Sequence, residues 1–213
     1  MATTIVVADD QDLVRMGLVR MLSDVPDFTV VGEAQTGEDA ITLVRQYRPD
    51  VVLMDVRMPG IGGLEATKKI LSVHAKAKVV AVTGVSDVSY ADRLFKVGGA
   101  GYVTKDAGFD EIIQAIEKVV SGDRYMSASV AQSLALKNVS TETDCSPFDN
   151  LSERELQTAV MISSGMKAAD IADSFCISSK TVNSYRYRIF EKLKINTDVE
   201  LALLAAKYNL LDV

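Results

Sequence analysis

Three runs of β-branched and other apolar residues mark the first half of the chain, at 5–8, 51–54 and 79–82. Weaker runs of similar length occur at 29–32 and 101–104. Continuous apolar runs are typical of parallel strands whose two faces are both covered by helices. The segments that follow the runs have the apolar spacing of amphipathic helices, near residues 12–23, 38–47, 63–73, 87–97 and 109–121. Five strand–helix pairs in alternation predict a doubly wound α/β domain with a five-stranded parallel sheet over residues 1–125.

The alternation stops after residues 121–122, and the remaining sequence has a different period. Residues 126–149 are mostly polar and contain Pro147, which indicates a linker, with a short helix near 127–136. From residue 150 the apolar period is helical throughout. Two capping boxes, in which a hydroxyl and a carboxylate satisfy free amides at a helix start, are expected at 152–155 and 197–200. A second, all-α domain over residues 150–213 is therefore predicted, with helices near 153–164, 168–175, 179–193 and 198–208.

Hydropathy and cysteine content indicate the compartment. No apolar stretch approaches the ~18 residues that a membrane-spanning helix needs. The first residues have no basic region ahead of an apolar core, so we expect no cleaved signal peptide. The two cysteines, Cys145 and Cys176, form no CxxC pair, which argues against a zinc site or a disulfide framework. We therefore expect a cytoplasmic protein without a membrane partner.

Acidic side chains directly follow two of the predicted strands. Asp9 and Asp10 come after the first run, and Asp55 comes after the third. In an open parallel sheet these two strands flank the switch point, where sites form at the carboxyl ends of the strands. Three carboxylates in one place repel each other, and a hard divalent cation such as Mg²⁺ relieves that repulsion. Thr83 ends the fourth strand, and Lys105 follows the fifth, so both should face the same crevice. A hydroxyl and an ammonium in that place suit the binding of a phosphoryl group.

Each of these residues alone has a simpler explanation, because acidic residues after strands often cap helices or lie in solvated loops. Five such residues at successive strand ends favour a functional site over that explanation. Other phosphate-binding sites lack their motifs, since the chain has no P-loop sequence and the glycines at 60–63 do not have dinucleotide-binding spacing. The single histidine, His74, is expected at the surface rather than in catalysis.

About the first 120 residues resemble the receiver domain of two-component response regulators. The residues that carry the resemblance are Asp9, Asp10, Asp55 with Pro59 four residues later, Thr83, Tyr102 and Lys105. The resemblance implies a flavodoxin-like sheet of strand order 2-1-3-4-5. It also implies that Asp55 accepts a phosphoryl group from a phosphohistidine donor. Asp106 stands where many receivers have a proline, so a cis peptide bond after Lys105 is not expected.

The same resemblance assigns a metal site and a switch. The implied Mg²⁺ ligands are Asp10, Asp55 and the backbone carbonyl of Arg57, with Asp9 acting through a metal-bound water. The implied phosphoryl-binding residues are Thr83 and Lys105. Tyr102 is the aromatic residue whose orientation follows Thr83.

The second half contains one strongly basic segment in a chain of net charge −6. Residues 180–194 hold five basic residues and one acidic residue. On a helix of about 3.6 residues per turn, one stripe faces the core, namely Val182, Tyr185, Ile189 and Leu193. The opposite side carries Lys180, Asn183, Ser184, Tyr187 and Glu191, flanked by Arg188 and Lys194. Such a side is either a solvated surface or a DNA-reading surface, since Asn recognises adenine while Lys and Arg bind phosphates.

Residues 151–208 resemble the LuxR/FixJ-type helix-turn-helix. The match includes Gly165 and the stretches 151–155, 171–172, 177–182 and 192–193, with Tyr185 where the family often has histidine. The resemblance implies that 179–193 is the recognition helix, that 168–175 supports it, and that 198–208 forms a dimer contact. The implied base-facing residues are Asn183, Ser184 and Tyr187. The implied phosphate contacts are Lys180, Thr181, Arg186, Arg188 and Lys192.

The two halves in this order are similar to NarL/FixJ-type response regulators, and residues 55–67 and 180–193 look closest to the GacA/UvrY/VarA group. The resemblance implies a transcription regulator activated by phosphorylation, not an enzyme, that forms a homodimer when phosphorylated or bound to DNA. It implies a tripartite hybrid sensor histidine kinase and double-stranded DNA as partners. Genes for small regulatory RNAs are the implied targets.

Two other functions stay open from the residues themselves. A Mg²⁺-dependent phosphotransfer relay would use the same carboxylates and keep the C-terminal helices for protein contacts. Salt-dependent DNA binding distinguishes a transcription regulator from such a relay. A regulator that senses a small molecule would need an apolar pocket in the first domain, where this chain has a carboxylate cluster.

Overall fold

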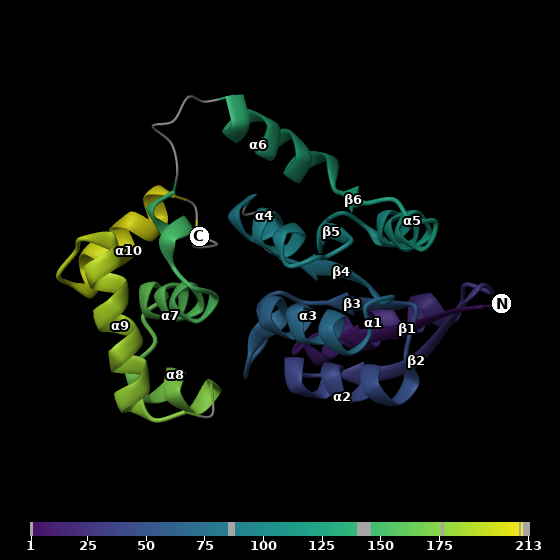
Figure 1. Cartoon of the computed structure of the whole chain (residues 1–213), viewed down its shortest axis with the longest axis horizontal. Coiled ribbons are helices and arrows are strands. Elements are labelled where there is room, and N and C mark those ends of the chain that lie inside the picture. Colours follow the sequence, from purple (N-terminus) through teal and green to yellow (C-terminus); the bar gives the residue numbers. More distant parts are fainter. Residues whose placement is uncertain (1, 85–87, 140–145, 176, 209, 211–213) are drawn as a thin grey trace. The chain divides into compact units, whose positions relative to one another are not determined.

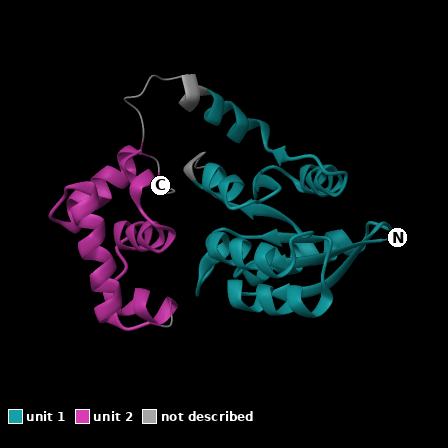
Figure 2. Ribbon diagram, viewed as in Figure 1, with its two compact units in different colours: residues 1–136 teal, residues 137–213 magenta. Residues whose placement is uncertain are grey.

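The computed structural model of the chain describes residues 2–84, 88–139, 146–175, 177–208 and 210. Two compact units, Met1–Leu136 and Lys137–Val213, divide the chain, and each is described by itself (Figure 2). Cys145, Cys176 and the middle of the expected linker lie outside the described residues. Within the described ranges, every helix is too short or too polar to span a bilayer.

The first unit is built on a parallel sheet with strand order β2-β1-β3-β4-β5-β6 (Figure 1). The strands are β1 Thr3–Ala8, β2 Phe28–Ala34, β3 Val51–Met54, β4 Lys78–Thr83, β5 Gly101–Thr104 and β6 Tyr125–Met126. The three strongest apolar runs of the sequence lie in β1, β3 and β4, the central strands. The doubly wound α/β fold and the order of the first five strands are therefore confirmed.

The sheet has six strands rather than the predicted five. β6 pairs in parallel with β5, with Tyr125 opposite Gly101 and Met126 opposite Tyr102. The amide of Tyr125 donates to the carbonyl of Ala100 at 3.1 Å, and the amide of Ser127 donates to the carbonyl of Tyr102 at 3.0 Å. A two-residue strand is too short to show a period in the sequence, so the prediction has no strand here and ends the first domain at residue 125, inside β6. α6, Ala128–Val139, follows the strand directly and extends beyond the short helix expected there.

Helices cover both faces of this sheet: α1 Asp12–Ser23, α2 Gly37–Tyr47, α3 Gly62–Val73, α4 Val88–Lys96 and α5 Phe109–Val120. Successive strand residues point to opposite faces, which gives two separate cores. One core joins Val7 and Leu53 to α1 and α5, and the other joins Val6 and Val52 to α2 and α3. Because both faces of the sheet are covered by apolar cores, a polar site is expected in the loops at the strand ends.

The second unit is helical, as predicted. It consists of the 3₁₀ helix η1 Pro147–Asn150 and the helices α7 Glu153–Ser163, α8 Ala168–Ser174, α9 Ser179–Leu193 and α10 Asp198–Lys207. Ser152 and Glu155 form the expected capping box at the start of α7. The capping box expected at 197–200 forms only in part. The Thr197 hydroxyl accepts from the amide of Glu200, but the Glu200 carboxylate accepts from the amide of Asn196 rather than from that of Thr197. A small core that includes Ile171 and Val182 holds α8 against α9.

Candidate functional site

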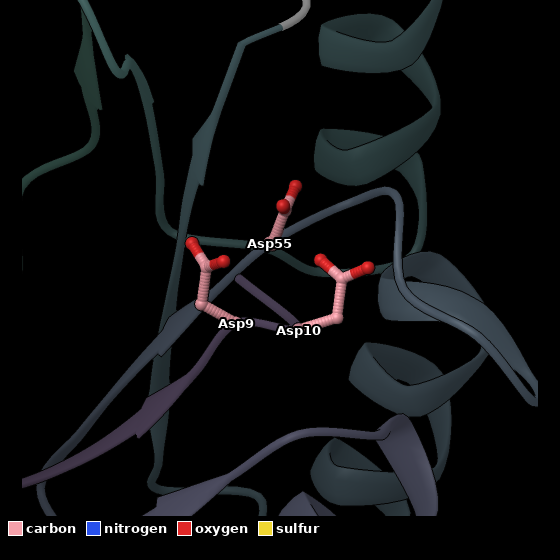
Figure 3. Close-up of side chains that lie close together, drawn as sticks. All are labelled: Asp9, Asp10 and Asp55. Carbon is pink, nitrogen blue, oxygen red and sulfur yellow. The ribbon is translucent and has the colours of Figure 1, made fainter. Parts of the chain in front are cut away.

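Three carboxylates converge at the carboxyl ends of β1 and β3. Asp9, Asp10 and Asp55 each place an oxygen within 4.8 Å of the others (Figure 3). Asp9 and Asp55 are buried, whereas Asp10 is exposed. The loops after β1 and β3 bring these residues together because the two strands are neighbours in a parallel sheet. The predicted acidic cluster is therefore present in the structure.

Lys105 is the cation of this cluster. Its Nζ lies 2.7 Å from Oδ2 of Asp9 and 2.8 Å from Oδ2 of Asp55. The residue follows β5, and its amide donates to the carbonyl of Thr83 at 2.9 Å, which ties it to the end of β4. Burial lowers the pKa of the Lys105 ammonium, but Asp55 and Asp9 outweigh burial and the net pKa is raised. Lys105 therefore stays charged beside the two buried carboxylates.

One ammonium does not neutralise three carboxylates. Burial raises the pKa of Asp9, and the Lys105 hydrogen bond offsets that rise only in part. Asp10 is exposed as a residue, but partial desolvation of its carboxyl group and the charges of Asp55 and Asp9 raise its pKa. Clustered carboxylate oxygens with one face open to solvent are the ligand set that a hard divalent cation prefers. The residues present therefore fit the Mg²⁺ site that the family resemblance implies.

The loop after β3 is held close to Asp55. The amide of Arg57 donates to Oδ1 of Asp55 at 3.1 Å, and the amide of Gly63 donates to the carbonyl of Val56 at 3.0 Å. A Cβ at Gly63 would overlap the backbone carbonyl of Asp55. The start of α3 can approach Asp55 only because residue 63 has no side chain.

Arg15 supports the site through the backbone of Asp9, and no motif in the sequence predicts this role. Its side chain is buried on α1, and its Nη1 donates to the backbone carbonyl of Asp9 at 2.7 Å. The guanidinium also pairs with Asp12 and lies 3.5 Å from Glu33. Arg15 shares the buried stripe of α1 with Leu18 and Leu22, and a charge on an apolar stripe is the sequence signal that marks it.

Thr83 and Tyr102 lie on neighbouring strands, β4 and β5. Thr83 ends β4, and Tyr102 lies in the middle of β5, opposite Ala81 of β4. Both side chains are fully buried. All peptide bonds of the described residues are trans, including the one between Lys105 and Asp106.

In the second unit, α9 presents one side to the core and one to solvent. Val182, Ile189 and Leu193 are buried, while Tyr185 of the predicted core stripe is half-buried. The exposed residues of α9 are Ser179, Lys180, Asn183, Ser184, Tyr187, Arg188, Glu191 and Lys192. Tyr187 is 79% exposed, which is unusual for an aromatic residue. Thr181 is half-buried at the start of the helix, where its amide donates to Oγ of Ser178 at 3.2 Å.

Two of the expected phosphate contacts form ion pairs within the unit. Arg186 donates Nε and Nη2 to the two carboxylate oxygens of Asp198, each at 2.7 Å. The Nζ of Lys192 lies 2.6 Å from Oε2 of Glu155. Predicting either pair requires the positions of α10 and α7, which helical periodicity does not provide.

Family models match both parts of the chain. The response regulator receiver domain matches residues 5–117, and the LuxR family of bacterial regulatory proteins matches residues 149–205. Response regulator GacA of Pseudomonas aeruginosa is 54% identical over 208 residues, covering 98% of this chain and 97% of that protein. Response regulator UvrY of Escherichia coli K12 is 46% identical over 206 residues, covering 97% and 94%.

Solved structures share the same folds. A LuxR-family two-component response regulator from Aurantimonas sp. SI85-9A1 has a TM-score of 0.63 at 37% identity and covers 65% of this chain and 99% of its own. The RcsB response regulator of Salmonella typhimurium has a TM-score of 0.74 at 20% identity and covers 97% and 98%. Another RcsB structure, bound to promoter DNA with the phosphomimetic BeF₃⁻, has a TM-score of 0.62 at 20% identity over 96% and 98%. At 20% identity these likenesses concern the fold alone.

Proposed function

The chain belongs to the two-component response regulators that join a receiver domain to a LuxR-family regulatory domain, and we propose that phosphorylation of Asp55 controls its binding to DNA. The observation that carries the proposal is the contact of Lys105 with Asp55, at 2.8 Å, inside a cluster of carboxylates. This arrangement provides an acceptor oxygen next to a fixed positive charge.

Two buried carboxylates, those of Asp9 and Asp55, contact Lys105. Asp55 is the proposed acceptor because it follows β3, which is the acceptor position that the receiver resemblance implies. A carboxylate oxygen attacks the phosphorus of a phosphohistidine, the P–O bond forms, and the P–N bond breaks. The electron pair returns to the histidine, and an acyl phosphate remains on Asp55. Lys105 then moves from pairing with the carboxylate to pairing with a phosphoryl oxygen, and the Thr83 hydroxyl donates to another. The chain is thus a phosphoryl acceptor rather than a turnover enzyme.

Mg²⁺ is the proposed cofactor. Asp10, Asp55 and the backbone carbonyl of Arg57 would bind it, and Asp9 would act through a bound water. When bound, the ion supplies positive charge for the carboxylates and the transferring oxygens. The exposed position of Asp10, beside two buried acids, supports a direct ligand role for that residue.

Thr83 and Tyr102 are the proposed switch. They lie on adjacent strands, with Thr83 at the end of β4 and Tyr102 two register positions back along the sheet. A hydrogen bond from Thr83 to the phosphoryl group would change the packing that surrounds the Tyr102 ring. Local charge changes of this kind bias an element that has two arrangements.

The exposed side of α9 is the proposed DNA-reading surface. Asn183, Ser184 and Tyr187 face the bases in this proposal, and Lys180, Thr181 and Arg188 contact phosphates. Arg186 is a further phosphate candidate whose guanidinium is shared with Asp198. The exposure of Tyr187 supports a contact surface. Val199 and Leu203 on α10, 69% and 67% exposed, support that helix as the homodimer contact.

The resemblance to the GacA and UvrY regulators supports the finer assignments. We propose a tripartite hybrid sensor histidine kinase as the donor, and genes for small regulatory RNAs as targets. The cytoplasm is the proposed compartment because the target is double-stranded DNA.

Mass spectrometry of the intact chain tests the acceptor. Incubation with Mg²⁺ and acetyl phosphate should add one phosphoryl group, stable in acid and labile in base. Asp55→Asn should add none. Undiminished labelling of Asp55→Asn would overturn the assignment.

A further inference from the structure

Lys192 lies in the basic helix with a side chain that is 40% exposed, yet its ammonium contacts other elements of the same unit. Its Nζ is 2.6 Å from Oε2 of Glu155 and donates to the backbone carbonyl of Asn150 at 3.3 Å. The three residues belong to the last turn of α9, the first turn of α7 and the end of η1. Lys192 therefore connects three elements of the second unit.

Glu155 is a buried carboxylate, with a side chain only 4% exposed. Its Oε2 also accepts from the amide of Ser152 at 2.8 Å, which completes the capping box of α7. Burial raises the pKa of Glu155, but the hydrogen bonds from Lys192 and Ser152 outweigh burial and the net pKa is lowered. A buried charge that loses its partner is strongly destabilising, so Glu155 holds Lys192 in place.

Helix geometry places Lys192 away from the proposed reading surface. Each residue turns the helix by about 100°, so the nine positions from Asn183 to Lys192 amount to about 180°. Lys180 lies only three positions before Asn183, about 60° round the helix on the same side. Leu193, next to Lys192, is buried. If Asn183 faces the bases, the Lys192 stem leaves the helix on the far side.

We propose that Lys192 is a positioning residue, which sets the orientation of α9 on α7 through Glu155 and makes no phosphate contact. The inference rests on the proposed DNA-binding function. It replaces the phosphate contact that the family resemblance implies for Lys192. Loss of the pair leaves α9 attached through its apolar stripe but free to rotate or tilt. Base contacts depend strongly on that orientation. The non-specific attraction between basic side chains and phosphates depends on it less.

Matched lysine substitutions on one helix test the proposal. The probes are a duplex selected from a random pool by the parent chain and a scrambled duplex of the same composition. Each chain is treated with Mg²⁺ and acetyl phosphate, and both affinities are measured over a series of salt concentrations. Lys180 is exposed and makes no ion pair with any described residue, so Lys180→Met is the control. It should weaken both duplexes alike and reduce the salt slope by about one phosphate contact.

Lys192→Met should behave differently. We expect the salt slope to stay at the parent value while the selected-to-scrambled affinity ratio falls about tenfold, an effect typical of coupled positions. Lys192→Arg, which keeps a donor for Glu155, should retain most of the ratio. A reduced salt slope in Lys192→Met, with an unchanged ratio, would overturn the proposal and restore the phosphate contact.

Glu155→Gln provides a second variant that keeps the capping box, because Gln also accepts from the Ser152 amide. Charge alone predicts tighter binding to every duplex, since one negative charge is removed. Positioning predicts a lower ratio, and no additional loss when Lys192→Met is added. Tighter binding of both duplexes would overturn the proposal even if Lys192→Met failed to fold. A parent chain without salt-dependent DNA binding would instead overturn the proposed function itself.

Discussion

The Nζ of Lys105 lies 2.8 Å from Oδ2 of Asp55, although 50 residues separate the two in sequence. The same Nζ also lies 2.7 Å from Asp9, so the ammonium bridges the two buried acids. Asp10 takes no part in this bridge and faces solvent. The three carboxylates are therefore not equivalent, and substitutions at each should have different effects.

Removing the charge of Asp10 should stabilise the metal-free chain. The pKa of Asp10 is raised in the folded state by partial desolvation of its carboxyl group and by the neighbouring acids, so the folded state binds its proton more tightly than the unfolded state does. Stability from that proton is present at low pH and is lost as the pH rises through the folded pKa. Asp10→Asn should therefore raise the free energy of unfolding at neutral pH in EDTA. Denaturant unfolding at pH 7 and pH 3 measures this. If Asp10→Asn raised the free energy of unfolding equally at both pH values, the negative charge of Asp10 would not be the cause.

Asp10→Ala should weaken Mg²⁺ binding more than Asp9→Ala does. Asp10 is the proposed direct ligand, whereas Asp9 is paired with Lys105 and is expected to act through water. In the parent, Mg²⁺ at about 100 times its Kd should raise the free energy of unfolding by about 2.7 kcal/mol. Titration calorimetry on the three chains checks the order of affinities. Equal affinities in all three would mean that the metal site is wrongly placed.

Gly63→Ala should destabilise the chain and slow the phosphorylation of Asp55. The new Cβ would overlap the Asp55 carbonyl, so either the loop or the start of α3 must shift. Gly17→Ala is the matched control, because a Cβ there meets nothing within 4 Å. Gly17 lies within α1, where alanine should add about 0.5–1 kcal/mol of stability. Unfolding curves and the rate of labelling by acetyl phosphate measure both effects, and normal labelling of Gly63→Ala would contradict the tight approach.

Asn183→Ala and Arg188→Ala should have opposite signatures on DNA. Loss of a bidentate base contact at Asn183 should cost on the order of 1–3 kcal/mol at one base position. Arg188→Ala should weaken selected and scrambled duplexes alike and lower the salt slope by about one contact. Competition between the two duplexes at two salt concentrations distinguishes these results. If Asn183→Ala leaves the affinity ratio unchanged, Ser184 and Tyr187 become the base-reading candidates, and if neither substitution affects binding the exposed side is only a solvated surface.

The sequence predicts the acidic cluster because its members directly follow apolar strand runs. Parallel strands end at one edge of the sheet, so Asp9, Asp10 and Asp55 needed no tertiary information beyond strand order. β6 was missed because its pairing comes from the amides of Tyr125 and Ser127, not from a residue pattern. The partner of Arg15 is a backbone carbonyl, which no side-chain motif records.

The recognition helix shows a different limit. Helical periodicity correctly identifies its buried and exposed sides, with Tyr185 only half-buried. Family resemblance assigns Arg186 and Lys192 to phosphates, but their contacts with Asp198 and Glu155 depend on how α10 and α7 pack. For Lys192, the sequence itself argues against a position beside Asn183. The nine positions between them leave the two side chains about 180° apart around the helix.

The affinity of the chain for its selected duplex, before and after phosphorylation, tests the central claim most directly. Fluorescence anisotropy with the parent and Asp55→Asn, each with and without acetyl phosphate and Mg²⁺, gives the four values needed. Phosphorylation should tighten the parent by roughly tenfold, in the usual range of allosteric coupling, and should leave Asp55→Asn unchanged. Equal affinities for the phosphorylated and unphosphorylated parent, or the same gain in Asp55→Asn, would contradict control of DNA binding by Asp55.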